Sequence, residues 1–132
     1  MRVGYGIANV DIIKALYKLR PPFNITTLSL EAARVALKDD AFVNESISQN
    51  FEQMKRYELF AKENTLEFIE SYTNFVTLCF QMPQESSHIA NELLKQGMIV
   101  RDLAGYGLNA IRVTVGKADE NSRFFELCEK LL

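Results

Sequence analysis

Two arginines in the C-terminal half of the chain are its best candidates for binding a ligand. Arg101 follows the short apolar run 98–100, and Arg112 lies inside a second run, 110–115. In the second run β-branched residues alternate with Arg112, so a strand there would carry the guanidinium on the opposite face. An arginine on a strand needs an anion, because a buried ion without a partner costs on the order of several kcal/mol. Its planar fork fits a carboxylate or a phosphate bidentately.

Two kinds of anion could meet this need. An Asp or Glu elsewhere in the fold would form a structural ion pair, which also places charge in such positions. A bound ligand is the other possibility. The two arginines flank one glycine-rich loop, which contains Gly105 and Gly107, and this arrangement favours the ligand.

Length and composition bound the remaining classes. A chain of 132 residues, 48% hydrophobic and 24% charged, is expected to form one globular domain or a large piece of a bigger one. A net charge of −2 and a pI near 5.5 argue against nucleic-acid binding. The sequence has no polybasic run for a membrane surface, no apolar stretch of transmembrane length and no signal peptide. A cytoplasmic protein is expected.

Cysteine and histidine usage limits the chemistry further. Cys79 and Cys128 fall at apolar positions of a strand and a helix, so both are interpreted as buried free thiols. His88 is the only histidine. A histidine-cysteine metal cluster or a Ser-His-Asp triad cannot be assembled from this chain, and no metal site is expected.

The first half of the chain is expected to be mostly helical. Met1 to Ala8 contains strand-like residues and is interpreted as a strand. Asn9 is a suitable N-cap for the first helix, and Thr26, Thr27 or Ser29 for the second. The expected helices cover residues 10–19, about 27–38 and 41–64.

The helix at 41–64 is long enough to connect two parts of a molecule. At 1.5 Å per residue it would measure roughly 33 Å. One apolar stripe follows it at helical spacing, which favours a core-facing helix. The stripe contains Val43, Ile47, Phe51, Met54 and Ala61.

The second half changes to an α/β pattern. Strands are expected near 66–69, 74–80, 98–101 and 110–115. Helices are expected from about residue 86, with Gly97 as a left-handed C-terminal cap, and over 118–131. The predicted fold class is therefore α/β, with a small α+β domain in which helices pack on a small mixed sheet. The predicted division is a remnant of a larger domain at 1–40, the long interdomain helix at 41–64 and the small domain at 65–132.

Six short motifs together carry a resemblance to a known family. They are RVGY at 2–5, RPPFN at 20–24, SYTNF at 71–75, GMIVRD at 97–102, GYG at 105–107 and IRVTVG at 111–116. In this order and spacing the chain resembles the C-terminal third of the histidinol-phosphate aminotransferases. These are pyridoxal-phosphate enzymes of the fold type I, aspartate aminotransferase-like class, and the resemblance covers essentially the whole chain.

The resemblance implies roles for five residues. Arg2 would bind the cofactor phosphate, Arg112 the substrate α-carboxylate and Arg101 the substrate phosphate. Asn74 sits in a motif that the family uses near the substrate, and Tyr106 would sit over the site. The resemblance also implies a homodimer that acts on a small amino-acid or phosphate substrate, histidinol phosphate with 2-oxoglutarate, in histidine biosynthesis.

The family pattern also includes parts that this sequence lacks. The Schiff-base lysine of the family lies in a Ser-x-x-Lys-x-Phe-Gly segment before the position of Arg2, and the aspartate that pairs with the cofactor ring lies earlier still. Transamination needs that lysine, so no catalytic residue is assigned here and no covalently bound cofactor is expected. The chain alone is expected to be inactive. The alternative is a free-standing module that binds an anion or a partner without catalysis.

Overall fold

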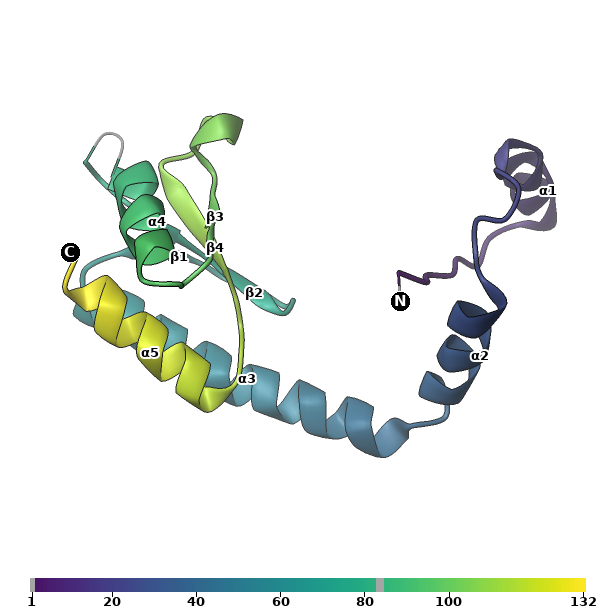
Figure 1. Ribbon diagram of the computed structural model, residues 1–132, viewed down its shortest axis with the longest axis horizontal. Helices are drawn as coiled ribbons and strands as arrows, with labels where there is room; N and C mark the ends of the chain where they lie inside the picture. Colours follow the sequence, from purple (N-terminus) through teal and green to yellow (C-terminus); the bar gives the residue numbers. More distant parts are fainter. Residues whose placement is uncertain (1, 83–84) are drawn as a thin grey trace. The chain divides into compact units, whose positions relative to one another are not determined.

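A computed structural model describes residues 2–82 and 85–132 of the chain. The chain separates into two compact units, Met1–Asn44 and Glu45–Leu132 (Figure 1). The long helix α3, Asp40–Glu63, begins in the first unit and continues into the second. Neither α3 nor any other helix within the described ranges combines the length and the apolarity that crossing a membrane requires.

The first unit contains two short helices, α1 (Val10–Leu19) and α2 (Thr27–Ala36). Both begin at predicted caps. The Asn9 side chain accepts the backbone N–H two residues later at 2.9 Å, and Thr26 Oγ1 accepts the backbone N–H three residues later at 3.1 Å. Each cap satisfies a donor that the start of a helix leaves free. Neither helix contains a buried residue.

The prediction of a strand at the start of the chain is wrong. Residues 2–9 form neither helix nor strand, and Met1 lies outside the described residues. A strand needs a neighbouring backbone to pair its N–H and C=O groups. In the described part of the first unit, the other regular elements are helices.

The apolar stripe predicted along α3 divides into an exposed and a buried part. Val43, Ile47 and Phe51 are between 45% and 49% exposed, whereas Met54 and Ala61 are buried. In Figure 1 only the C-terminal part of α3 runs alongside α5, Ala118–Glu129. The periodicity is helical throughout, but a packing partner within the second unit covers only one end of the stripe.

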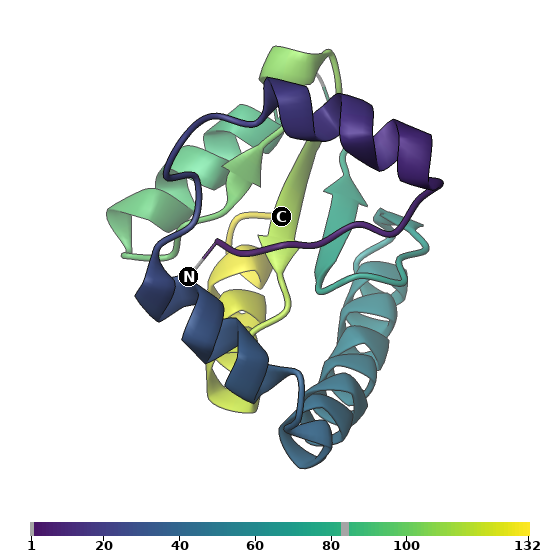
Figure 2. The ribbon, with the colours of Figure 1, turned by 90° about the vertical axis from the view of Figure 1, so that its right-hand side faces the viewer.

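Within residues 2–82 and 85–132, four strands form one sheet in the order β1-β2-β4-β3 (Figure 2). Every described pairing in it is antiparallel. The strands are β1 (Glu67–Ile69), β2 (Phe75–Cys79), β3 (Arg101–Asp102) and β4 (Ala110–Thr114).

The predicted α/β class with packed helices is confirmed. The prediction of a mixed sheet is wrong, because the described strand pairs are all antiparallel. Helix α4, Glu85–Lys95, connects β2 to β3, and such a crossover is typical of parallel neighbours. The two strands do run in the same direction, since each is antiparallel to β4. They do not pair with each other, because β4 lies between them and forms a hairpin with β3. The result is a split β-α-β unit.

The hydrophobic core lies against one face of the sheet. Val76 and Leu78 of β2, and Ile111 and Val113 of β4, belong to the core cluster on this face. Buried side chains of α3, α4 and α5 belong to the same cluster, so all three helices pack on this face. The helical part of the cluster comprises Met54, Tyr57, Phe60, Ala61, Ile89, Leu93, Phe124 and Cys128.

Four aromatic rings join α3 to α5 beneath the sheet. Tyr57 and Phe60 meet Phe124 and Phe125 with ring centroids 4.7 to 6.1 Å apart. Tilted, edge-on and stacked pairs all occur, and such pairs contribute about 0.5–1.5 kcal/mol beyond their buried area. This cluster fixes the second unit around the C-terminal part of α3.

A buried asparagine fixes the end of β4. Asn121 Oδ1 accepts the N–H of Gly116 at 2.9 Å, and its Nδ2 donates to the carbonyl of Gly116 at 2.8 Å. The Tyr57 hydroxyl donates to Asn121 Oδ1 at 3.0 Å, and Asn121 Nδ2 also donates to Gln53 Oε1 at 3.1 Å. The carboxamide therefore pairs the backbone after β4 as a neighbouring strand would, and ties it to α3.

Candidate anion-binding site

Arg101 and Arg112 lie directly opposite each other in the pairing of β3 with β4. Directly opposed residues in an antiparallel pair project from the same face, with Cβ atoms about 4.5–5.5 Å apart. The two guanidinium groups therefore project from one face of the sheet. Register extends this row through Thr77 on β2 to Ile69 on β1. We call these four residues the arginine row.

The arginine row lies on the face opposite the core. On β4, Ile111 and Val113 are buried, while Arg112 between them is half-buried. This alternation confirms the prediction made for residues 110–115. Arg101, on the edge strand β3, is exposed. A ligand could therefore approach the row without displacing core side chains.

The two cysteines follow the same division of faces, and both are free thiols. Cys128 is buried in the core as predicted, and burial raises the pKa of its thiol to about 12. Cys79 is only half-buried, which corrects the prediction of a fully buried thiol. It occupies the face of β2 that carries Thr77, and the described helices of the second unit pack on the other face.

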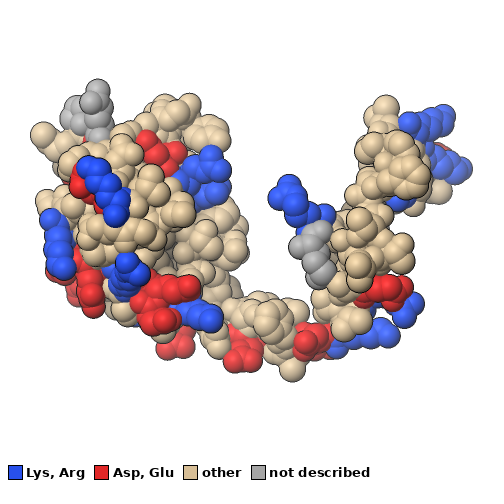
Figure 3. Space-filling model, viewed as in Figure 1, with Lys and Arg blue, Asp and Glu red and all other residues tan. Residues whose placement is uncertain are grey.

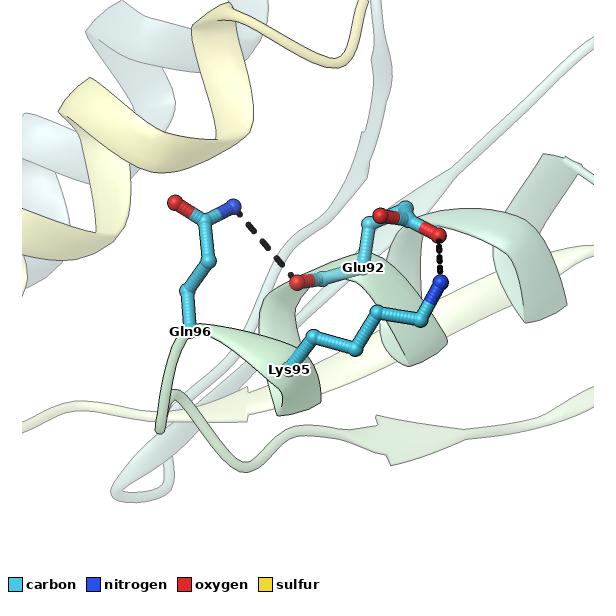
Figure 4. A network of polar contacts seen from close by, with 3 residues as sticks. All are labelled: Glu92, Lys95 and Gln96. Atoms are coloured by element: carbon cyan, nitrogen blue, oxygen red, sulfur yellow. Dashed lines mark hydrogen bonds and ion pairs between the residues drawn. The ribbon is translucent and has the colours of Figure 1, made fainter.

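The two opposed arginines have no internal counter-ion in the described part of the chain. All ion pairs among residues 2–82 and 85–132 join helical residues three positions apart, and neither arginine takes part. Figure 4 shows one such pair, Lys95 with Glu92 on α4, where Gln96 also donates to the backbone oxygen of Glu92. Like charges directly opposite each other destabilise a strand pair. The arginine row therefore carries positive charge that no carboxylate of the described residues neutralises through an ion pair.

Charge on the helical side is distributed differently. In Figure 3, acidic and basic side chains are interspersed over α3 and α5. Neighbouring charges of opposite sign on such exposed helices interact weakly, each pair contributing roughly 0–1 kcal/mol. Two adjacent cations without a carboxylate thus set the arginine row apart from this surface.

The carboxylate nearest in sequence to the row is engaged elsewhere. Asp102 follows Arg101 but accepts the Ser87 hydroxyl at 2.6 Å, the Ser86 hydroxyl at 3.2 Å and the N–H of Ala104 at 2.9 Å. The hydrogen bond from Ser87, followed by the one from Ala104, holds the pKa of Asp102 below its usual range. Its charge anchors α4 to β3 and does not form an ion pair with Arg101.

An aromatic ring supports one of the two cations. The Cζ atom of Arg112 lies over the ring of Phe75, 4.9 Å from its centroid. Phe75 pairs with Thr114 and is therefore the diagonal neighbour of Arg112 across β2 and β4. Long side chains reach such diagonal neighbours. A cation over an aromatic face is attracted by about 0.5–1 kcal/mol at exposed sites and more when desolvated.

Asn74 lies at a separate cavity. It lines an open cavity of about 590 Å³ among residues 46–51 of α3, the turn between β1 and β2 and the junction of β4 with α5. Tyr72, Lys117 and Glu120 are among the other lining residues, and no arginine is among them. The backbone carbonyl of Asn74 pairs with the N–H of Val115 at 2.9 Å. The structure does not bring this side chain into the arginine row.

Tyr106 lies beyond the opposite end of β4. It ends the short 3-10 helix η1, Ala104–Tyr106, and is 72% exposed. Gly107 follows in the left-handed region at φ 78°, where a side chain would be strained. Among the four residues predicted to bind substrate, the structure therefore places Arg101 with Arg112 and leaves Asn74 and Tyr106 apart from them. Their roles stay predictions.

Arg2 belongs to the first unit. It is exposed, and its backbone adopts φ 54°, which is uncommon for a residue with a side chain. It takes part in no ion pair within the described residues. Its predicted contact with a cofactor phosphate stays a prediction.

Sequence reasoning missed two residues that border the arginines. Phe75 and Thr77 were predicted only to lie in the strand near 74–80, and the motif at 71–75, which includes Phe75, gave that residue no role of its own. Their spacing of two does place them on one face. Which face and which partners they meet depends on the register of β2 with β4, and the sequence contains no local signal for that register.

Comparison with known proteins gives a consistent family. Residues 1–131 match the sequence profile described as aminotransferase class I and II. A curated histidinol-phosphate aminotransferase from Sulfurimonas denitrificans is 64% identical over 132 residues, which are 100% of this chain and 36% of that protein. The chain thus spans just over a third of this relative, and it corresponds to the relative's C-terminal region.

Solved structures share the fold. Superposition on a histidinol-phosphate aminotransferase from Clostridium acetobutylicum gives a TM-score of 0.82 at 20% identity, over 93% of this chain and 38% of that one. The enzyme from Sinorhizobium meliloti in complex with pyridoxal-5'-phosphate gives 0.76 at 24% identity, over 90% and 34%. At these identities the structures confirm the fold of an aminotransferase C-terminal domain.

Proposed function

We propose, since this chain belongs to the class I and II aminotransferase family, that it is the C-terminal part of a pyridoxal-phosphate-dependent histidinol-phosphate aminotransferase. The observation that carries the proposal is the direct opposition of Arg101 and Arg112 on one face of the sheet. The name of the Sulfurimonas relative supports the substrate. The unpartnered cations support a ligand with two negative charges.

The two substrates of such an enzyme have matching charge. The phosphate of histidinol phosphate is a dianion near neutral pH, and 2-oxoglutarate carries two carboxylates. Arg112 would bind a carboxylate bidentately, and Arg101 would bind the substrate phosphate. Because the arginines stand side by side, one pair of cations can serve both substrates in turn. Asn74 and Tyr106 are proposed to lie near the substrate in the whole enzyme.

Arg2 is the residue of this chain proposed to hold the cofactor phosphate. Its guanidinium is exposed and free of an ion pair in the described residues, so its chemistry fits a phosphate. When bound, pyridoxal phosphate supplies the electron sink through which an amino group can leave one substrate and enter another. The family's lysine motif is absent from this sequence, so the chain alone is proposed to bind substrates without transamination.

Two further properties are carried over from the family resemblance. The whole enzyme is proposed to be a cytoplasmic homodimer in histidine biosynthesis. Light scattering of a whole enzyme that contains this chain, with and without cofactor, tests the dimer. A monomer at micromolar concentration that still turns over substrate would contradict it.

A fusion protein tests the proposed activity. The part of the Sulfurimonas relative that this chain does not match would be joined to the N-terminus of this chain. The fusion should form glutamate from histidinol phosphate and 2-oxoglutarate when pyridoxal phosphate is present. Cofactor binding together with turnover of aromatic amino acids but not of histidinol phosphate would contradict the proposed substrate.

Variants of the fusion protein test the two arginines. Arg112→Lys replaces a bidentate fork by a point charge and should lower kcat/KM for 2-oxoglutarate, the substrate that carries carboxylates, by about 10- to 100-fold, the equivalent of one charged hydrogen bond. Arg101→Ala should chiefly raise KM for histidinol phosphate. Lys55→Ala removes an exposed cation from α3 and serves as the control for net charge. Equal kinetics in all three variants would remove the arginines from the site.

The second candidate function is anion binding without catalysis. It is favoured by one observation, that the second unit contains the whole described core together with both arginines. Histidinol phosphate or inorganic phosphate should then raise the melting temperature of the isolated chain. Arg101→Ala should abolish that rise and Lys55→Ala should not. Anion binding without catalysis is favoured over the aminotransferase proposal if the fusion protein is inactive and either phosphate compound still stabilises the isolated chain.

A further inference from the structure

We propose that Phe75 is a positioning residue, whose ring holds the guanidinium of Arg112 in the orientation that binds a carboxylate. This inference rests on the proposed function, since it concerns the same arginine. Its structural basis is the contact of the Arg112 Cζ atom with the Phe75 ring, 4.9 Å from the centroid. Both side chains are half-buried, so the contact is partly withdrawn from water.

The register explains why Arg112 needs such support. Its direct neighbours along the arginine row are Arg101 on one side and Thr77 on the other. Arg101 repels it, and the threonine hydroxyl can fix only one N–H at most. An arginine side chain has about 2 kcal/mol of rotamer entropy to lose on binding. A platform that holds the guanidinium beforehand reduces the ordering cost that falls on the ligand.

The ring can do this without competing for the ligand. An aromatic face attracts the cation as a whole but offers no acceptor lone pair. The five N–H donors of arginine lie in the plane of the guanidinium. The Phe75 ring lies against Cζ and accepts none of these N–H groups through a lone pair, so the fork stays available to a carboxylate, whereas a carboxylate partner from the protein would occupy it.

The position of Phe75 separates it from the core aromatics. Tyr57, Phe60 and Phe124 are buried against the opposite face of the sheet. Phe75 stands beside the arginine row, where the described helices of the second unit do not pack. Its ring is therefore free to serve Arg112. A core aromatic would be held by other apolar side chains.

The first experiment needs no ligand. The NMR order parameter of the Arg112 Nε–Hε vector would be measured in the 132-residue chain and in Phe75→Leu and Phe75→Tyr. Leucine keeps an apolar side chain without a π face, so the Arg112 vector should become as mobile as that of an exposed arginine. Tyrosine keeps the face and should preserve the order. Arg56, whose Cζ lies 5.2 Å from the Phe125 ring, is the internal control and should not change.

The second experiment adds a carboxylate probe. Titration with succinate should show that Phe75→Leu weakens binding by roughly three- to tenfold, the range of a partly exposed cation–π contact. Phe75→Tyr should bind as the unsubstituted chain does. Arg112→Ala should abolish the response.

The outcomes separate the two proposals. An ordered Arg112 in Phe75→Leu, with unchanged core methyl signals, overturns the role of Phe75. Loss of binding in Arg112→Ala together with full affinity in Phe75→Leu overturns it as well. Equal affinity of the unsubstituted chain and Arg112→Ala, or no binding by either, contradicts the proposed function at Arg112. In that case the order parameters still decide whether Phe75 positions the side chain.

Discussion

The two units of the chain contain helices of similar quality but differ in what the helices bury. In the first unit α1 and α2 are capped and have no buried residue. In the second unit α3, α4 and α5 share one core with the sheet. Capping and apolar periodicity are thus sufficient to specify a helix, whereas a core needs a second surface of matching shape. The comparison separates local from tertiary stabilisation within one chain.

Large apolar side chains of the first unit are exposed, unlike those of the core in the second unit. Phe23 is 99% exposed and Ile7 is 92% exposed, and large apolar residues of α1 and α2 are exposed as well. Isolated helices of about ten residues are marginal in water, because nucleation costs more than a few hydrogen bonds return. Most helical stability in proteins comes from packing of an apolar face. The first unit therefore lacks the main source of stability that the second unit has.

Hydrogen exchange should show the largest difference between the units. The hydrogen bonds of the β2 and β4 amides break only when the core unfolds. These amides should therefore exchange at least about a thousandfold more slowly than the amides of α1 and α2. Exchange of the 132-residue chain followed by NMR measures this directly. Comparable protection in both units would mean that the first unit is stabilised by contacts other than those described.

Truncation of a core aromatic should have the next largest effect. Phe124→Ala removes a ring that is 1% exposed and meets Tyr57 and Phe60. It should lower the free energy of unfolding by about 3–5 kcal/mol. Phe23→Ala in the first unit is the matched control and should stay within about 0.5 kcal/mol. Urea unfolding followed by circular dichroism compares them, and equal effects would refute the contrast.

The asparagine after β4 should contribute less than the aromatic core. Asn121→Ala leaves the backbone groups of Gly116 and the Tyr57 hydroxyl without their partner. Buried groups left unsatisfied cost about 1–3 kcal/mol, and we expect the upper part of that range. Asn91→Ala, an exposed asparagine on α4, should be nearly neutral in the same unfolding experiment. A neutral Asn121→Ala would show that water replaces the carboxamide.

The smallest effect concerns pH. The hydroxyl of Ser87 and the N–H of Ala104 hold the pKa of Asp102 below its ordinary value. Its contribution to stability is therefore present above the unfolded pKa, about 4, and is lost as the pH falls through the folded pKa. Ser87→Ala removes the closest donor, so it should raise the Asp102 pKa toward the ordinary value.

A side-chain NMR titration measures the Asp102 pKa. Ser48→Ala, an exposed serine on α3, is the control and should leave the titration unchanged. If the Asp102 pKa is unaltered in Ser87→Ala, the hydrogen bond from Ser87 does not lower it, and the backbone N–H of Ala104 is the donor that does.

The sequence predicted those features that neighbouring residues determine. The cap at Asn9 and the left-handed Gly97 at the end of α4, φ 78°, are local signals and were found. So was the alternation around Arg112, because a period of two needs no knowledge of partners. The approximate positions of the five α-helices in the described part of the chain follow from the same kind of information.

Features that depend on partners distant in sequence were predicted poorly. The stripe on α3 gave no indication that Val43 and Ile47 would stay exposed, since periodicity does not show which turns receive a partner. The mixed sheet was wrong because the crossover through α4 does not reveal that β4 inserts between β2 and β3. The direct opposition of Arg101 and Arg112, and the ring of Phe75 beside them, depend on strand register. The motifs located the arginines without giving their geometry.

The contacts within the arginine row differ in the sequence separation of the residues that form them. Arg101 meets Arg112 within a hairpin, whereas Phe75 and Thr77 reach Arg112 only by closing a loop that includes α4 and β3. Closure of the longer loop costs more entropy and must be offset by the core contacts of β2. A partly folded chain with only the hairpin would hold two repelling cations without their aromatic support. The anion site and the core are therefore completed in the same folding event.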